Sequence, residues 1–199
     1  DGQKLIQMQE TAGRTASNLA CSGNISIIAK HTPERRALNF LDAKTGDVRA
    51  IDVDWRSAHK LRIERERTRP CGYLVAADQA IAIQRLRDLG VQVKALAAND
   101  VTQTWDTETY VIANEDSGSR QDARGAISDA QSEIRLLKVS TKVSRVSPKA
   151  GTFYVPLNQP LTALIVAALE PDSQNSFVAN RLMSLEDSKL VRVMKSPKL

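Results

Sequence analysis

The chain has 199 residues, with 28 Lys and Arg against 23 Asp and Glu, a net charge of +5, and apolar side chains at 42% of its positions. A globular chain of this length and composition buries a core without help from a metal or a disulfide. Basic and acidic residues are interleaved along the whole sequence, which weakens the case for a concentrated cationic surface, and we expect no nucleic-acid partner. No apolar run approaches the ~20 residues of a membrane helix, so no membrane partner is expected either.

The first segment, residues 3–20, carries apolar side chains at helical spacing, although Gly13 weakens its middle. This pattern predicts a helix with a weak apolar face, which suits a connector better than a core element. Because the chain opens on Asp1 and not on Met, we expect it to be a fragment of a longer protein. The predicted organisation is a connector helix over residues 1–24, coming from an absent upstream domain, and one α+β domain over residues 25–199.

Short runs of β-forming residues fill residues 25–75, and they predict successive antiparallel strands. The runs are NISIIAK, RALNFL, VRAIDVDW, KLRIERE and CGYLVA, with a hairpin turn at Gly46. The most basic run, Lys60–Arg69, alternates so that Leu61 and Ile63 face one way and charged residues the other. We expect this charged side to be a solvated sheet face, with a phosphate-binding surface as the less favoured alternative.

Residues 76–147 predict a strand–helix–strand unit followed by more strands. Asp78 is expected to cap a helix that ends at Gly90, and VQVKAL then returns as a strand. A strand over 104–114 comes next, then a polar loop over 115–132, and then a long strand or hairpin over 133–147. Near the end of the chain, KLVRVMK is expected to add an edge strand.

The most ordered pattern lies between residues 150 and 182. Thr152–Val155 suit a strand, and a helix is expected after Asn158, with Leu161, Leu164, Ile165 and Ala168 on its buried face and Gln159 exposed in its first turn. Pro171 ends that helix, and Asp172 or Ser173 is expected to cap another short one. The predicted fold class is α+β, with a mostly antiparallel mixed β-sheet, three to four helices and the N-terminal connector helix.

Residues that could perform chemistry are scarce, because the chain has only two histidines, His31 and His59. His31 and Glu34 are spaced as a pair of metal ligands, but the nearest third ligand would be His59. Asp52 and Asp54 share one strand face, where solvation is the simpler interpretation and a bound cation the alternative. We therefore predict no catalytic, cofactor-binding or metal-binding residue in these 199 residues.

The two cysteines, Cys21 and Cys71, lie too far apart in the sequence for a zinc ribbon or a redox pair. A disulfide between them and two unrelated thiols both remain compatible with the sequence.

Two segments resemble the C-terminal region of a bacterial branch of the zinc carboxypeptidase A-like peptidases. The first is PCGYLVAADQAIAIQRLRDLGVQVKAL and the second is AGTFYVPLNQPLTALIVAALEPDSQNSFV. The resemblance covers roughly residues 48 to 183, and its most specific feature is the fixed spacing of the Q-P and E-P turns. The matching residues are Tyr73, Leu74, Val75, Leu86, Gly90, Val91, Gly151, Val155, Pro156, Gln159, Pro160, Leu169, Glu170, Pro171, Ser173, Ser176 and Val178.

The resemblance stops where the family's chemistry begins. The zinc ligands, the substrate-binding arginine and the catalytic glutamate of such peptidases have no counterpart here, and Leu89 stands where this branch often has a histidine. It implies a noncatalytic accessory domain that packs on the catalytic domain of the same parent chain or shapes peptide access to it. Zinc would belong to that catalytic domain, and a periplasmic or secreted location is favoured. The alternative is a free-standing module that binds peptides or glycans.

Overall fold

The computed structural model describes residues 2–119 and 133–199, which combine α-helices with antiparallel sheets. The predicted α+β class with a mostly antiparallel sheet is confirmed. Two units are distinguished along the chain: Ser26–Glu66 forms one, and the residues up to Ile25 together with Arg67–Leu199 form the other. We call the first the ribbon and the second the main unit.

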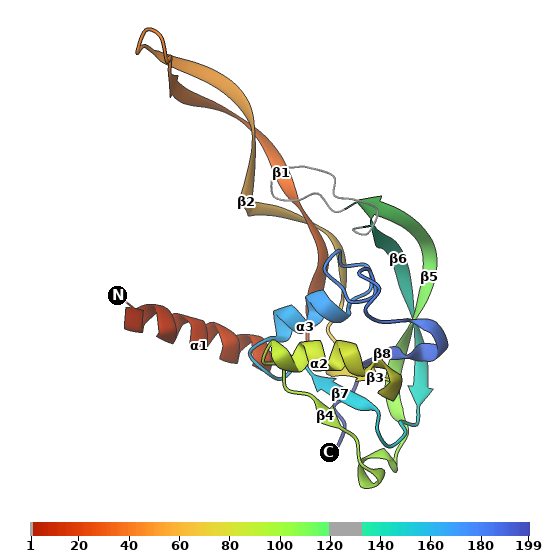
Figure 1. The fold of residues 1–199 in the computed structure, drawn as a ribbon. Coiled ribbons are helices and arrows are strands. Elements are labelled where there is room, and N and C mark those ends of the chain that lie inside the picture. Colours follow the sequence, from red (N-terminus) through yellow and green to blue (C-terminus); the bar gives the residue numbers. More distant parts are fainter. Residues whose placement is uncertain (1, 120–132) are drawn as a thin grey trace. The chain divides into compact units, whose positions relative to one another are not determined.

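The ribbon consists of two long paired strands, β1 (Asn24–Leu41) and β2 (Val48–Thr68) (Figure 1). The sequence predicted four separate strands here, but the structure continues each strand through the polar stretches around His31 and His59. Cross-strand ion pairs explain why those stretches stay extended: Lys60 meets Glu34 at 2.7 Å, and Lys30 meets Glu64 at 3.0 Å. Gly46 has a φ of 74° in the connecting turn, as the hairpin prediction requires.

The main unit contains a sheet with the strand order β4-β7-β3-β8-β5-β6. Its strands are β3 (Gly72–Val75), β4 (Lys94–Ala95), β5 (Trp105–Ser119), β6 (Glu133–Val146), β7 (Phe153–Pro156) and β8 (Leu190–Val193). The prediction of an edge strand near the C-terminus was wrong, because β8 pairs with both β3 and β5. All four residues of β8 are buried, which is typical of a central strand.

The predicted polar loop over residues 115–132 was also partly wrong. Residues 115–119 belong to β5 and pair with the start of β6, so that Glu115 lies opposite Leu137 and Ser119 opposite Glu133. The rest of that predicted loop lies outside the described residues. The long strand predicted after it is β6, and it is one strand and not a hairpin.

The described α-helices are α1 (Gly2–Asn18), α2 (Ala80–Asp88) and α3 (Thr162–Leu169), and α2 and α3 cover one face of the sheet (Figure 1). In α2, Ala82, Ile83 and Leu86 are buried. Asp78 does not cap this helix as predicted, because a short 3-10 turn over Ala77–Gln79 precedes it. Gly90 ends it as predicted: its φ of 86° lets the Val91 N–H reach the Leu86 carbonyl at 3.0 Å.

Helix α3 begins later than expected, and no side chain caps it. Its N-cap position is Leu161, while Asn158 is exposed and makes no capping hydrogen bond. Buried residues lie on more than one side of this helix, which is typical of a helix inside a core. Leu161 and Leu164, which were predicted on its buried face, are only half-buried. The second short helix predicted after Pro171 is absent, and consecutive turns replace it.

Gln159 was predicted to be exposed and is in fact buried, with 3% of its surface accessible. Its side-chain oxygen accepts a hydrogen bond from the Gln92 N–H at 2.8 Å, and its amide group donates to the carbonyls of Gln92 and Pro156. One side chain thus supplies backbone partners to two segments, the end of β7 and the stretch before β4. The Q-P turn is therefore a structural joint of the main unit.

Replacing Gln159 with Ala should lower the free energy of unfolding by about 1–3 kcal/mol, because it leaves buried backbone groups without partners. Urea denaturation measures this change. The matched control is Asn158→Ala at the neighbouring exposed position, which should change stability by less than about 0.5 kcal/mol. Equal effects of the two substitutions would contradict the role of Gln159 as a joint.

One hydrophobic cluster of the main unit lies around β3, β7 and β8. It joins Leu74, Leu96, Trp105, Tyr154, Val191 and Val193, with Val101 and Val146 packed against it. Trp105 and Tyr154 meet edge to face, with ring centroids 5.4 Å apart. Gly72 permits this packing, because a Cβ there would lie 2.5 Å from the Val155 carbonyl oxygen and 2.7 Å from the Tyr154 ring.

Candidate functional site

The residues that drew attention as possible metal ligands do not converge in the structure. His31 and His59 lie within the strands of the ribbon and are exposed. The His31 ring contacts the Ser57 carbonyl at 3.2 Å, and Glu34 binds Lys60 and Arg36, whose hydrogen bonds lower the pKa of its carboxyl group. His59 lies in the middle of β2. The side chains of His31 and Glu34 are thus engaged by neighbours on the ribbon.

Other acidic residues considered for metal binding are also separate. Asp52 and Asp54 are exposed on β2. Within residues 2–119 and 133–199, no group of three or more His, Cys, Asp or Glu side chains is placed to hold a metal ion. Nor is any helix in that part of the chain long and apolar enough to cross a membrane.

A cluster of buried charges lies where the end of β2, β3, β8 and the E-P turn meet. We call Arg67, Tyr73, Glu170, Asp172 and Arg192 the buried charge cluster. Arg67 binds both oxygens of Asp172 at 2.7 Å and one oxygen of Glu170 at 3.0 Å. The other Glu170 oxygen accepts from the Tyr73 hydroxyl at 2.9 Å and from Arg192 at 3.1 Å.

The two arginines also reach outside the cluster. Arg67 donates to the Val139 carbonyl at 2.8 Å, and Arg192 donates to the Thr68 carbonyl and binds Glu108. These bonds tie β6, the end of β2 and β5 to the E-P turn. The cluster therefore holds together strands that are far apart in the sequence.

The electrostatics of the cluster keep its arginines charged. Burial alone lowers the pKa of Arg67, but the hydrogen bonds that Arg67 donates to Asp172 and the charges of Asp172 and Glu170 outweigh burial and raise it. The pKa of Arg192 is likewise raised in spite of burial, first by the charge of Glu170. Because Glu170 is fully buried and its oxygens are already engaged, the cluster is suited to holding the fold and not to proton transfer with a substrate.

The tyrosines around the cluster should ionise only at high pH. Burial, and then the charge of Glu170, raises the pKa of Tyr73 and of Tyr110 well above the usual value, and burial raises the pKa of Tyr154 to about 12. These are the three tyrosines of the chain. An absorbance titration at 295 nm should therefore show no tyrosinate in the folded protein near pH 10, where the chain unfolded in urea titrates at about the ordinary tyrosine pKa.

The same shifts predict how stability depends on alkaline pH. A folded-state pKa above the unfolded value contributes stability that is fully present below about pH 10 and is lost as pH rises through the folded pKa. We therefore expect unfolding to begin above pH 10. A tyrosine of the folded chain that titrates at its ordinary pKa would contradict the buried environment described here.

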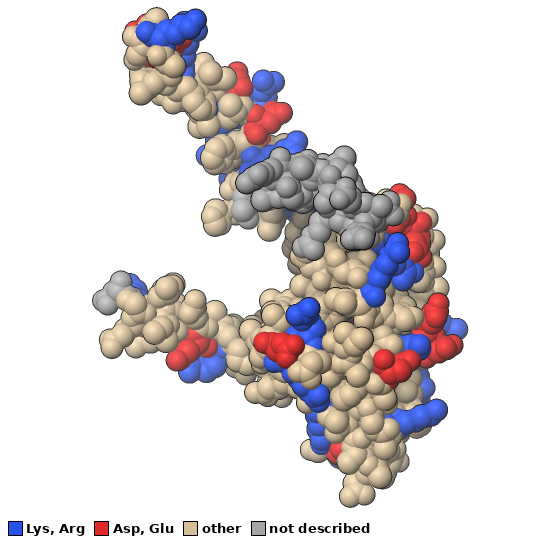
Figure 2. All heavy atoms as spheres, viewed as in Figure 1, with Lys and Arg blue, Asp and Glu red and all other residues tan. Residues whose placement is uncertain are grey.

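An exposed apolar face runs along α1. It comprises Lys4, Gln7, Met8, Thr11, Ala12, Thr15, Ala16 and Leu19, and we call it the α1 face. Helix α1 has no buried residue, and Leu5, Ile6 and Met8 are each more than half exposed. Figure 2 shows that the surface along this helix is mostly uncharged. The α1 face is therefore an apolar surface without a partner among the described residues.

A disulfide within the main unit joins the segment that follows α1 to the residue before β3. Cys21 is bonded to Cys71, so the first of the two alternatives left open by the sequence is the one present. The Cys21 N–H also donates to the Pro70 carbonyl at 3.2 Å, and a Cβ at Gly13 would lie 3.0 Å from Pro160. One side of the helix therefore approaches the Q-P turn, while the α1 face lies on another side.

The chain matches no protein-family model, no curated protein and no solved structure. The resemblance to the carboxypeptidase-like family therefore stands on the sequence motifs alone.

The buried charge cluster was missed by reasoning from sequence. Arg67 belongs to the basic run Lys60–Arg69, which was interpreted as a solvated sheet face with mixed charges, although the Arg67 side chain is only 10% exposed. One signal was present: Arg192 is a lone charge inside the apolar run Leu190–Val193, and such a charge needs a partner of opposite sign. Nothing in the local sequence identifies that partner as Glu170.

Proposed function

We propose that this chain is a noncatalytic accessory domain whose α1 face packs on the catalytic domain of a zinc carboxypeptidase-like protein. The observation that carries the proposal is the exposure of the α1 face on a helix with no buried residue. A contiguous exposed apolar surface is typical of a contact with another protein. The alternative, a free-standing peptide- or glycan-binding module, gives no reason for such a surface.

The location of the resemblance supports the same proposal. Among the matching residues, Tyr73 and Glu170 belong to the buried charge cluster, and Gln159 joins β7 to the stretch before β4. Ser176 is fully buried, donates to the Pro171 carbonyl and accepts from the Ala179 N–H. These motif residues serve packing, so the resemblance concerns an architecture that accompanies the peptidase and not the peptidase chemistry.

The disulfide favours an oxidising compartment. Bonds such as Cys21–Cys71 persist in secreted and periplasmic proteins and are rare in the cytosol. This agrees with the export that the resemblance implies. In the proposed protein, zinc belongs to the catalytic domain, and the present chain supports that domain or shapes the path of the peptide substrate.

The first test is to determine the coding sequence that precedes Asp1. The proposal expects a preceding domain with an H-x-x-E motif, a later histidine and a catalytic glutamate, which together provide the zinc site of such peptidases. A preceding sequence without these residues would overturn the proposed parent class.

The second test concerns the α1 face in the longer protein. Met8→Glu places a charge on this face and should uncouple the thermal unfolding of the accessory and catalytic domains in calorimetry. The matched control is Gln3→Glu, which adds the same charge to the same helix outside the α1 face. If Met8→Glu and Gln3→Glu leave the catalytic domain's transition equally unchanged, the α1 face is not its docking surface.

A further inference from the structure

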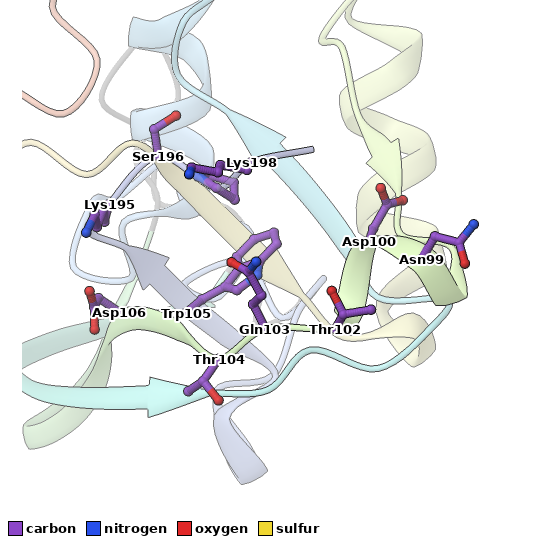
Figure 3. A pocket seen from close by; sticks show the side chains of 11 residues that line it. Asn99, Asp100, Thr102, Gln103, Thr104, Trp105, Asp106, Lys195, Ser196 and Lys198 are labelled. Atoms are coloured by element: carbon purple, nitrogen blue, oxygen red, sulfur yellow. The ribbon is translucent and has the colours of Figure 1, made fainter.

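A small polar pocket lies at the end of the sheet where β5 begins and β8 ends. Its volume is about 280 Å³, and residues 99–100, 102–106 and 195–198 line it. Figure 3 shows Trp105 and Gln103 in the middle of this group, with Lys195, Ser196 and Lys198 on one side and Asn99 and Asp100 on the other. Two segments distant in the sequence thus form opposite walls.

The floor and one wall of the pocket are held in place by the fold. Trp105 is 6% exposed and packs edge to face on Tyr154. The Met194 N–H donates to the Asp106 carbonyl at 2.9 Å, which fixes the segment after β8 against the start of β5. Thr104 and Ser147 share a hydrogen bond of 3.1 Å at the rim. The pocket is therefore a feature of the folded main unit.

The charged side chains around the pocket leave it with uncompensated positive charge. Asp100 binds Lys94 at 2.9 Å and accepts from the Ala97 N–H, and Asp106 binds Arg145. Both carboxylates of the lining are thus already neutralised by cations outside it. Lys195 and Lys198, by contrast, form no ion pair with the residues that the structure describes. An added anionic group would be attracted to the lysine wall.

We propose that this pocket binds an anionic polyol of monosaccharide size. Lys195 and Lys198 would hold its carboxylate or phosphate group, since ammonium groups make charge-assisted hydrogen bonds with both. Asn99 and Gln103 supply amide donors and acceptors for hydroxyl groups, and Trp105 provides the apolar floor. The volume, about 280 Å³, is near the lower end of ligand pockets and suits one sugar ring.

The test uses the indole N–H resonance of Trp105 in a Trp55→Phe background, where it is the one remaining tryptophan. Glucuronate, glucose 6-phosphate and neutral glucose are titrated separately into the millimolar range. We expect a saturable shift with glucuronate, with glucose 6-phosphate or with both, which distinguishes a carboxylate from a phosphate requirement. An equal shift with glucose, or no saturable shift with either anion, would overturn the proposal.

Variants locate the binding. Lys195→Gln combined with Lys198→Gln should weaken binding about tenfold or more, because it removes both charged donors. The matched control is Lys138→Gln combined with Lys142→Gln, two exposed lysines on β6 outside the pocket. Equal weakening by the two pairs would show that net charge and not the pocket attracts the anion, and would overturn the proposal. Unchanged urea midpoints verify that both double variants are folded.

Discussion

Replacing Glu170 with Ala is expected to lower the free energy of unfolding by about 3–5 kcal/mol, because breaking a buried ion pair leaves its partner charge uncompensated. Glu170 is fully buried and binds Arg67, Arg192 and the Tyr73 hydroxyl. Without its carboxylate, Arg192, which is 1% exposed, keeps polar contacts with Glu108 and the Thr68 carbonyl among the described residues. A loss of this size approaches the whole stability of a small domain.

The matched control for this substitution is Glu115→Ala. Glu115 also pairs with an arginine through two hydrogen bonds, but its side chain is 45% exposed and Arg135 remains partly hydrated without it. An exposed pair of this kind contributes at most about 1 kcal/mol. Urea denaturation of both variants in a Trp55→Phe background, followed by the fluorescence of Trp105, gives the comparison. If Glu170→Ala cost no more than Glu115→Ala, the cluster would not be holding the fold.

The ribbon shows where local sequence predicts structure well. Alternating residues and the turn at Gly46 were enough to predict antiparallel strands and their hairpin, because both signals act over a few residues. The same local reasoning wrongly predicted that the strands end near His31 and near His59, where β1 and β2 in fact continue. Ion pairs between Lys60 and Glu34 sustain the pairing there, and they join residues 26 positions apart in the sequence.

The segment after Pro156 shows where local reasoning fails. Asn158 is a favourable capping residue and was predicted to begin a helix. Gln159 is polar and was predicted to be exposed. The structure buries Gln159 because the stretch around Gln92 packs beside it and needs hydrogen-bond partners. The interaction spans 67 positions in the sequence, and no local pattern contains it.

The α1 face is the part of the candidate interface that the sequence did predict. The spacing of Leu5, Met8 and Leu19 indicated a helix with a weak apolar side, and the structure leaves that side exposed. The polar pocket beside Trp105 was not predicted, because it joins residues 99–100 and 102–106 to residues 195–198 through the pairing of β5 with β8. Both this pocket and the buried charge cluster are formed by residues that lie far apart in the sequence and meet only in the folded chain.

The disulfide should contribute strongly to the stability of the main unit. Cys21 and Cys71 are 50 residues apart, and the bond closes a loop that contains the whole ribbon. In the chain-entropy account, closing a loop of this length stabilises the folded state by about 4 kcal/mol, because the unfolded chain loses conformational freedom. Cys21→Ala should therefore lower the free energy of unfolding by about this amount. Cys21 is the better site for the substitution, since it is exposed and Cys71 is 3% exposed.

Breaking the bond should also release α1 locally, which distinguishes tethering from a global effect. The helix has no buried residue, so little besides the Cys21–Cys71 bond and the approach of Gly13 to Pro160 holds its C-terminal end. Amide hydrogen exchange in Cys21→Ala should show faster exchange in α1 than in α2, whose Ile83 and Leu86 are buried. Reduction of the unsubstituted chain with dithiothreitol serves as the matched control, because it opens the same bond without changing a side chain. If both treatments left stability and α1 exchange unchanged, the bond would not be the anchor of this helix.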